Sequence, residues 1–407
     1  GLGDVYKRQL WHKKLDKKLV FTPRVKRFFI ILALAVIASY AVYLATKHRV
    51  NLGVVLPLVI SFALSFLLEK AKFKAYENSA RKKLASMPEL KIIIITASFG
   101  KTSIKNFIFV LLKNDFACRK TPRSVNTLAG LIQDVNNELA AGTQIYIAEA
   151  GARLKGDIAQ ITEFLSPQIA IVGEIGAQHI EYFKTFENIR ATKLEALGSK
   201  RLEKAFVHSS TQANEGEKIE IYDKDLSGVE ASLDGVKFKL GEREFASPLL
   251  GKFNAANLAV CVKTALYLGL DEARIASALS RLKNVEHRLE RIDAGGKIII
   301  DDGFNGNFNG MSASYELVAS YEGRKVLVTP GIMESSDEEN EKLSKIINKT
   351  FDIVMLTSSL NAVALLKHLS RPKVIVIKDK SKMQEALAQN TKAGDLILFS
   401  NDAPSFM

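Results

Sequence analysis

The segment Ile92–Ser103 constrains the fold of this chain more than any other. Its run of β-branched apolar residues predicts a buried strand. A short loop ending in Gly-Lys-Thr-Ser follows, and the amphipathic segment Ile104–Leu112 predicts a helix. In such a strand–loop–helix unit the loop and the helix N-terminus can bind phosphate, with Lys101 neutralising its charge and Thr102 holding Mg²⁺. Because Ile95 occupies the first glycine position of the GxxxxGK[ST] pattern, a solvated Gly-Lys-Thr turn remains the alternative.

Two long apolar stretches precede this segment and dominate an expected N-terminal domain, residues 1–83. Residues 28–46 and residues 50–68 carry no charge. Each stretch is about long enough to cross the hydrocarbon core of a bilayer as a helix. The link Lys47–Arg49 is very short, so we expect a transmembrane helical hairpin. A pair of buried core helices is the alternative.

The positive charge of the chain lies around these two stretches. Residues 1–27 hold nine Lys and Arg and residues 70–83 hold six, whereas the link holds two. The positive-inside rule therefore places both ends of the hairpin, and the body of the chain, in the cytosol. Residues 1–83 carry a net charge of +13, which equals that of the whole chain, and the remaining 324 residues hold 40 basic and 40 acidic residues. This distribution favours contact with anionic lipid and argues against nucleic-acid binding.

The body of the chain is too long for one ordinary core, so we expect two domains. Strand-like runs alternate with helical patterns, which predicts mostly parallel sheets covered by helices. Residues 219–245 are rich in strand formers and predict an inserted antiparallel piece, and a new alternation starts at residues 297–301. The expected class is α/β, with a central P-loop domain built on a parallel sheet at 84–292 and a smaller Rossmann-like domain at 293–407.

Further polar motifs follow the phosphate-loop segment in order along the chain. Glu149 ends a predicted strand, where a carboxylate beside a phosphate loop is well placed to bind Mg²⁺. Asn254 begins a predicted helix, which it could cap. The segment Asp301–Phe308 follows another predicted strand, where an Asp can bind a ribose hydroxyl, although a turn rich in Asp, Asn and Gly is the alternative.

Taken together, these motifs resemble those of the Mur ligase family, most closely its D-alanyl-D-alanine-adding, MurF-type branch, over roughly residues 88–407. Thr96–Ser103 is similar to the family's Thr-Gly-Ser-x-Gly-Lys-Thr-Thr loop, and Asp301–Phe308 is similar to its Asp-Asp-x-Tyr-Asn-Ala-Asn-Pro signature. The other matching segments are 121–130, 145–151, 172–181, 191–195, 251–257 and 287–290. The positions that depart from the family pattern include Ala97, Glu174, Phe253, Phe304 and Phe308.

The resemblance implies ATP and Mg²⁺ as cofactors and a role for each matching residue. Lys101, His179 and Lys193 would be catalytic, and Lys193 would be carbamylated. The implied metal ligands are Thr102, Glu149, His179 and Lys193. The implied nucleotide contacts are Ser98, Gly100, Lys101, Thr102, Ser103, Asn254, Arg288, Asp302 and Asn305. A structural role for His179 and an ordinary surface position for Lys193 are the alternatives.

The resemblance further implies an ADP-forming ligase that uses ATP to add D-Ala-D-Ala to a UDP-linked muramoyl tripeptide through an acyl phosphate. Such a protein would serve peptidoglycan synthesis at the bacterial inner membrane, beside other cell-wall synthesis proteins, with its soluble domains facing the cytoplasm. Soluble members of the branch carry a UDP-binding domain where this chain has its apolar stretches. Two alternatives follow: a membrane-anchored amide ligase with another acceptor, like a poly-γ-glutamate synthase or a lipid-linked precursor amidase, and a non-enzymatic nucleotide-binding scaffold.

Overall fold

The computed structural model describes residues 21–401, apart from short internal segments. Those segments are residues 52, 54, 123–124, 177–179, 285–286, 304–305, 307, 333–336, 358–364 and 378. The chain divides into two compact units, Gly1–Ser86 and Met87–Met407. Each unit is described by itself below.

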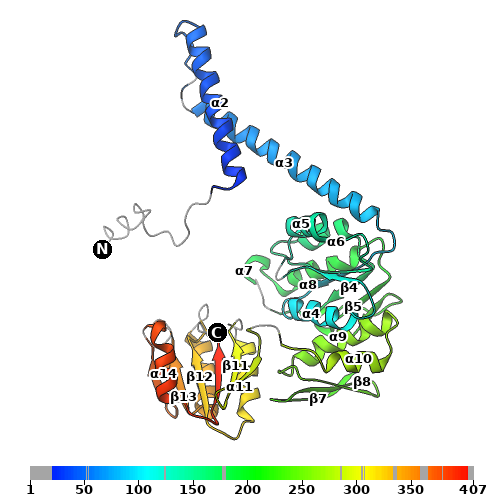
Figure 1. The fold of residues 1–407 in the computed structure, drawn as a ribbon, viewed down its shortest axis with the longest axis vertical. Helices are drawn as coiled ribbons and strands as arrows, with labels where there is room; N and C mark the ends of the chain where they lie inside the picture. Colours follow the sequence, from blue (N-terminus) through cyan, green and yellow to red (C-terminus); the bar gives the residue numbers. More distant parts are fainter. Residues whose placement is uncertain are drawn as a thin grey trace. The chain divides into compact units, whose positions relative to one another are not determined.

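The N-terminal unit is a hairpin of two helices, α2 (Pro23–Ala45) and α3 (Val55–Ala85) (Figure 1). Thr22 caps α2 by accepting a hydrogen bond from the Val25 N–H, and the proline that follows Thr22 suits the first helical position. Arg27 of α2 donates to Glu69 of α3, with Nε 3.0 Å from Oε1, which fastens the open end of the hairpin.

The helix bounds differ from those predicted at 28–46 and 50–68. The second helix begins at Val55 and continues 17 residues past Leu68, to Ala85. Residues 69–85 are charged, but they consist mainly of strong helix formers such as Ala, Lys, Glu and Arg, and they contain neither Gly nor Pro. The predicted end at residue 68 was taken from the end of the apolar stretch, whereas the helix propensity of the charged residues extends the helix to Ala85.

Only α2 among the described residues is long and apolar enough to cross a membrane, a finding that rests on length and composition. None of its most apolar window is buried by protein. In α3 the uncharged part runs from residue 55 to residue 68, about 21 Å of helix against a hydrocarbon core of about 30 Å. The second span predicted at 50–68 includes residues 52 and 54, which lie outside the described residues, so it stays a prediction.

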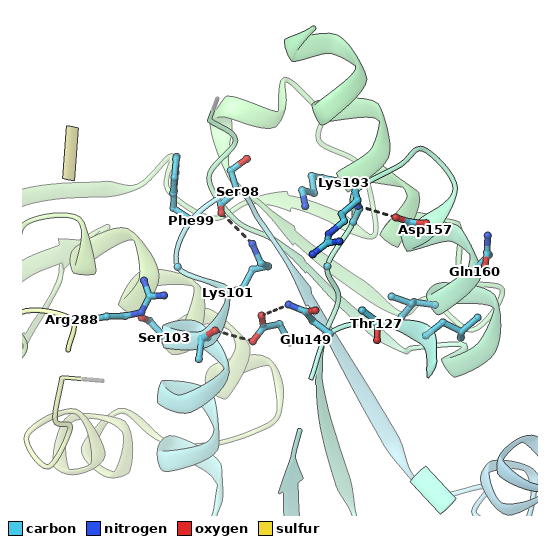
Figure 2. Close-up of a pocket in the computed structure, with 18 residues that line it drawn as sticks. Ser98, Phe99, Lys101, Ser103, Thr127, Glu149, Asp157, Gln160, Lys193 and Arg288 are labelled. Carbon is cyan, nitrogen blue, oxygen red and sulfur yellow. Dashed lines mark hydrogen bonds between the residues drawn. The ribbon is translucent and has the colours of Figure 1, made fainter. Parts of the chain in front are cut away.

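The larger unit begins with a sheet of six parallel strands in the order β2-β3-β1-β4-β5-β6. These strands are β1 (Lys91–Thr96), β2 (Cys118–Lys120), β3 (Ile145–Glu149), β4 (Ile169–Val172), β5 (Lys204–Val207) and β6 (Ile219–Ile221). The strand predicted at 92–96 is β1, which lies inside the sheet, and residues 92–95 are buried because helices cover both faces. The loop after β1 borders the pocket shown in Figure 2.

Helices and a small second sheet complete this part of the fold. The helices are α4 (Lys101–Leu112), α5 (Leu128–Glu138), α6 (Asp157–Leu165), α7 (Ile180–Phe183), α8 (Phe186–Leu194), α9 (Asn254–Tyr267) and α10 (Glu272–Leu279), with 3₁₀ turns η2 (Glu195–Gly198) and η3 (Ser209–Thr211). The small sheet is antiparallel, in the order β7 (Leu226–Ser232), β8 (Gly235–Leu240), β9 (Arg243–Ser247).

One hydrophobic core joins these layers. It runs from Ile93 and Ile95 of β1 through α4 and α9 to Phe238 of β8. The antiparallel piece predicted at 219–245 is thus present, but its first strand, β6, pairs parallel with β5 and extends the large sheet. The α/β class predicted from the sequence is confirmed.

The C-terminal part holds a second six-stranded sheet in the order β10-β11-β15-β12-β13-β14, parallel except for β10. Its strands are β10 (Glu290–Ala294), β11 (Lys297–Asp302), β12 (Lys325–Thr329), β13 (Ile353–Leu356), β14 (Lys373–Val376) and β15 (Leu396–Ser400). Its helices are α11 (Phe308–Ala319), α12 (Asp337–Thr350) and α14 (Met383–Asn390), with the 3₁₀ turn η4 (Lys380–Lys382). Residues of α11 and α12 form one hydrophobic cluster with the strands, and residues of α14 form another.

Sequence analysis missed β10, which pairs antiparallel with β11. The Gly295-Gly296 pair could have revealed this strand, because two consecutive glycines favour a two-residue hairpin turn. In the structure both residues adopt the positive φ that such a turn requires. The sheet therefore begins at Glu290, three residues before the expected domain boundary at 293.

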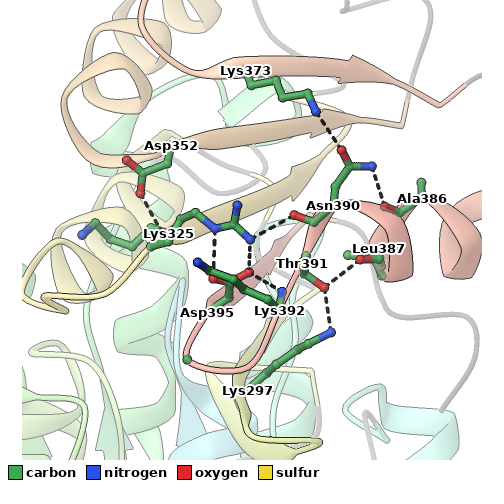
Figure 3. A network of polar contacts seen from close by, with 12 residues as sticks. Lys297, Lys325, Asp352, Lys373, Ala386, Leu387, Asn390, Thr391, Lys392 and Asp395 are labelled. Atoms are coloured by element: carbon green, nitrogen blue, oxygen red, sulfur yellow. Dashed lines mark hydrogen bonds and ion pairs between the residues drawn. The ribbon is translucent and has the colours of Figure 1, made fainter.

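A polar network fastens the amino ends of these strands (Figure 3). Arg324, just before β12, donates to both carboxylate oxygens of Asp395, at 3.0 and 2.6 Å. Asp395 lies just before β15, is almost fully buried, and also accepts the Lys392 N–H at 2.7 Å. The pair therefore ties β12 to β15, which are neighbours in the sheet.

We expect Arg324→Met to lower the free energy of unfolding by about 2 kcal/mol, because it leaves a buried carboxylate without its cation. Urea unfolding, followed by far-UV circular dichroism, measures the change in the free energy of unfolding. Lys373→Met is the matched control, since Lys373 belongs to the same network but is exposed, and its Nζ donates to the neutral Asn390 side chain. Equal effects of the two substitutions would contradict this role of Arg324.

Candidate functional site

The last residue of the loop between β1 and α4 has a backbone conformation that favours glycine. Gly100 adopts φ +78°, and a Cβ at this position would lie 2.7 Å from Oδ1 of Asn257. The loop is also tied to the segment after β4, because the Ser98 N–H donates to the Glu174 carbonyl and Ser98 Oγ donates to the Gly176 carbonyl. The Gly-Lys-Thr sequence therefore forms an ordered loop at a helix N-terminus, and the solvated-turn alternative is wrong.

A cavity of about 610 Å³ lies over this loop at the carboxyl ends of the parallel strands (Figure 2). That edge of an open parallel sheet is where ligands bind in α/β proteins. Among the predicted site residues, those lining the cavity are Ser98, Gly100, Lys101, Thr102, Ser103, Glu149, Lys193 and Arg288. Asn126, from the matching segment 121–130, also lines it, as do residues that were not predicted, including Phe99, Arg153, Asp157 and Gln160.

Lys101 folds back over the loop that precedes it. Its Nζ donates to the carbonyl of Ala97 at 2.7 Å and to that of Ser98 at 3.1 Å. Burial lowers the pKa of Lys101 to about 8, Arg288 lowers it further, and Glu149 opposes the shift. A phosphate in the cavity would stabilise the charged form of this lysine, since an anion favours the ammonium.

Glu149, at the end of β3, faces the first turns of α4. Its Oε2 accepts a hydrogen bond from the Thr102 hydroxyl at 2.9 Å and one from Lys105 Nζ at 3.1 Å, and its Oε1 accepts one from the Asn126 side chain at 3.1 Å. Its position follows from the sheet register, in which Ile95 of β1 pairs with Glu149. The prediction missed Lys105, although its spacing of four residues from Lys101 places both on one side of α4.

Thr102 and Glu149 fit a magnesium ion chemically. Both offer oxygen, the ligand atom that Mg²⁺ prefers, and Thr102 keeps its oxygen lone pairs while donating its hydrogen to Glu149. Over the described part of the chain there is no group of three His, Cys, Asp or Glu side chains that could hold a metal by itself. Mg²⁺ commonly uses one or two carboxylates together with substrate phosphates.

Lys193, in α8, lines the same cavity and is only 3% exposed. Burial lowers its pKa to about 7, and Lys101 lowers it further, while Asp157, Glu149 and Glu195 oppose the shift. An ordinary surface position is therefore wrong for Lys193. An amine that is partly neutral near pH 7 is nucleophilic enough to take up CO₂, so its carbamylation stays a prediction with a physical basis.

Other predicted residues do not line the cavity. Asn254 is buried, donates to the Leu250 carbonyl and accepts from the Asn257 side chain. Asp302 is buried, and its Oδ1 accepts the Leu289 N–H at 3.3 Å. His179 and Asn305 lie outside the described residues. Their direct contacts with nucleotide or metal stay predictions.

Arg288 reaches the cavity from a linker of unusual backbone geometry. Its neighbours His287 and Leu289 both adopt positive φ, 61° and 53°, which is costly for residues with side chains. Asp301 holds His287, with Nδ1 2.7 Å from Oδ2, and Asp302 holds Leu289. The two acidic residues of the signature thus position the linker that carries Arg288.

The fold and the site define a nucleotide-binding α/β protein of the P-loop type with a second, Rossmann-like sheet. Residues 95–265 match the Mur ligase middle domain, and residues 287–401 match the Mur ligase glutamate ligase domain. The chain belongs to the Mur ligase family, which confirms the resemblance inferred from its motifs.

Two curated relatives carry the name UDP-N-acetylmuramoyl-tripeptide–D-alanyl-D-alanine ligase. The relative from Bacillus subtilis (strain 168) is 28% identical over 331 residues, 76% of this chain and 72% of the relative. The relative from Borreliella burgdorferi is 25% identical over 315 residues, 72% of this chain and 64% of the relative. The chain thus spans 72% of the first relative's length and less than two thirds of the second's.

A solved structure has a similar fold. It is the MurF ligase from Thermotoga maritima in complex with ADP, which shares 26% identity and a TM-score of 0.68, covering 81% of this chain and 80% of that chain. The fold of 81% of this chain therefore has a counterpart in a ligase whose structure holds ADP.

We expect the ligand-free protein to gain stability with rising pH through Lys193. Its folded pKa of about 7 lies below its ordinary value of 10.5, so between these values the unfolded chain binds more protons and unfolding is increasingly disfavoured as pH rises. Lys193→Met removes a slope of up to about 1.4 kcal/mol per pH unit. Urea unfolding at pH 7 to 9.5 in CO₂-free buffer measures it, with the exposed Lys200→Met as control. Identical slopes in all three proteins would show that Lys193 is not desolvated.

Proposed function

We propose that this chain is an ATP-dependent, ADP-forming amide ligase that adds D-Ala-D-Ala to a UDP-linked muramoyl tripeptide in peptidoglycan synthesis. The observation that carries the proposal is one cavity that gathers Lys101, Thr102, Glu149 and Lys193. The names of the two curated relatives and the ADP complex of the similar structure support the substrates and the nucleotide.

The chemistry needs activation because a free carboxylate resists attack by an amine. Bound Mg·ATP would supply the phosphoryl group that converts the acceptor carboxylate into an acyl phosphate, and the amine of the dipeptide would then displace phosphate. Thr102 and Glu149 would hold the magnesium ion, with carbamylated Lys193 as a further anionic ligand. Lys101 and Arg288 would offset charge on the transferring phosphoryl group.

The floor of the cavity is the buried end of the parallel sheet, and Phe99, which is 39% exposed, contributes an aromatic wall. A ring atom of Phe99 would lie 2.3 Å from a Cβ placed at Gly176, so the ring is held close against that backbone. The work of the protein would be positioning and charge neutralisation.

A second candidate function is a membrane-anchored Mur-like amide ligase with another acceptor. The observation that favours it is α2, an apolar helix without protein cover. An anchored enzyme could act on a carboxylate presented at the membrane surface. Dependence of ADP release on the identity of the acceptor distinguishes the two functions.

We expect ADP release to require both the muramoyl tripeptide and D-Ala-D-Ala, with the amide product identified by its mass. Lys101→Ala should lower kcat/KM by at least about 100-fold, because it removes the cation that faces the phosphates. Lys252→Ala is the control, since this exposed lysine does not line the cavity. Turnover with a different acid in place of the tripeptide would favour the second function, and the absence of any amide product would refute both.

We also propose that α2 anchors the protein in the bacterial inner membrane, with residues 87–407 in the cytoplasm. Apolar side chains exposed on α2 include Phe29, Ile30, Leu34, Val36 and Ile37. Exposed apolar surface of this extent is unfavourable in water and suits a bilayer. Basic residues along the second half of α3 would contact anionic lipid.

We expect the full chain to remain with membranes after a carbonate wash. The double substitution Leu34→Lys and Ile37→Lys should release it, because each charge costs about 3 kcal/mol at the centre of a spanning helix. Leu154→Lys, at an exposed leucine of the larger unit, is the matched control. Recovery of the unaltered protein in the wash would rule out the anchor.

A further inference from the structure

Lys105 is a buried cation that does not line the cavity itself but contacts Glu149, which does. It lies on α4, one turn after Lys101, and none of its surface is exposed. Its neighbours along the helix, Ile104, Phe107 and Ile108, belong to the hydrophobic core. Lysine is almost never fully buried without a partner, and here Nζ lies 3.1 Å from Oε2 of Glu149, which is itself buried.

Stability alone does not account for this ion pair. Burying two charges carries a desolvation penalty that their attraction often fails to exceed, and apolar residues of similar volume are often equally stabilising. The position on α4 otherwise suits an apolar side chain, as its core neighbours show. The ion pair of Lys105 and Glu149 therefore points to a functional role at the metal–nucleotide site to which Glu149 belongs.

The carboxylate of Glu149 is held at both oxygens. Lys105 and the Thr102 hydroxyl contact Oε2, and the Asn126 amide contacts Oε1. Thr102 and Asn126 are neutral, so Lys105 is the partner among these three that also cancels the charge. A carboxylate neutralised in this way attracts a free divalent cation weakly.

We propose that Lys105 is a positioning residue that orients Glu149 and neutralises it, so that the site takes a divalent cation only together with the phosphates of a nucleotide. This inference rests on the proposed metal–nucleotide site. Without the Lys105 charge, Glu149 would lose its buried ion pair, and its carboxylate together with the Thr102 hydroxyl would bind Mg²⁺ in the absence of nucleotide. Lys105 thereby couples metal uptake to nucleotide binding.

The test is the thermal unfolding midpoint of the full chain in 0 and 10 mM MgCl₂ without nucleotide. The midpoint of the unaltered protein should not change with Mg²⁺. Lys105→Met keeps most of the length of the unbranched side chain and removes the charge, and its midpoint should rise by about 3 °C in Mg²⁺, as expected for a site of about millimolar affinity. Lys113→Met, at an exposed lysine following the same helix, should behave like the unaltered protein.

The double variant Lys105→Met with Glu149→Gln separates neutralisation from a merely structural role. It should be more stable than Lys105→Met in the absence of Mg²⁺, because no buried charge is left without a partner, and its midpoint should not respond to Mg²⁺. If Lys105→Met is too unstable to fold, recovery of a folded protein by Glu149→Gln supports the proposal. A midpoint of folded Lys105→Met that is unaffected by Mg²⁺, or a double variant no more stable than the single one, overturns it.

Binding of Mg·ATP to the unaltered protein is measured separately by calorimetry. Lack of binding there refutes the proposed function, whereas the response to Mg²⁺ alone reports on Lys105 and Glu149. Lys101 and Lys193 also face Glu149, from the loop and from α8, and they are identical in every variant compared. Their charges therefore cannot produce the difference between variants.

Discussion

The pairing of β1 with β3 is the constraint on which the site depends. In the parallel register Ile95 lies beside Glu149, which brings the end of β3 to the loop that precedes α4. The carboxylate then contacts Thr102, Lys105 and Asn126, three residues from two different segments. A shift of this register by one residue would turn the side chain of Glu149 to the other face of the sheet.

Burial then sets the chemistry of the charged groups around Glu149. Lys101 and Lys193 both have pKa values lowered chiefly by desolvation, to about 8 and about 7. A bound anion would stabilise such a lysine in its charged form. Without an anion, the neutral amine is open to chemical modification. Arg288 differs because a strained linker brings it to the cavity, and Asp301 and Asp302 hold that linker. In the described structure Asp301 and Asp302 therefore influence the site by fixing the backbone of the linker that carries Arg288.

The differences between prediction and structure have identifiable causes. The end of α3 was placed too early because charge was taken as a boundary, although Lys, Glu and Ala favour a helix. The strand β10 was missed because its alternating polar residues belong to an edge strand, and the Gly295-Gly296 turn was not used. Lys105 was missed because a single lysine in an amphipathic helix normally faces water, and only its contact with Glu149 shows otherwise.

The sequence by itself determined the elements whose signals are local. A run of buried isoleucines predicts β1, the Gly-Lys-Thr segment predicts a phosphate loop, and an uncharged stretch predicts the apolar helix α2, because each pattern lies within one element. Tertiary structure alone decided that Lys193 is buried, that Asp302 faces the linker and that Lys105 neutralises Glu149. These contacts join residues far apart in the chain, and their energies depend on strand register and desolvation, which no local pattern records.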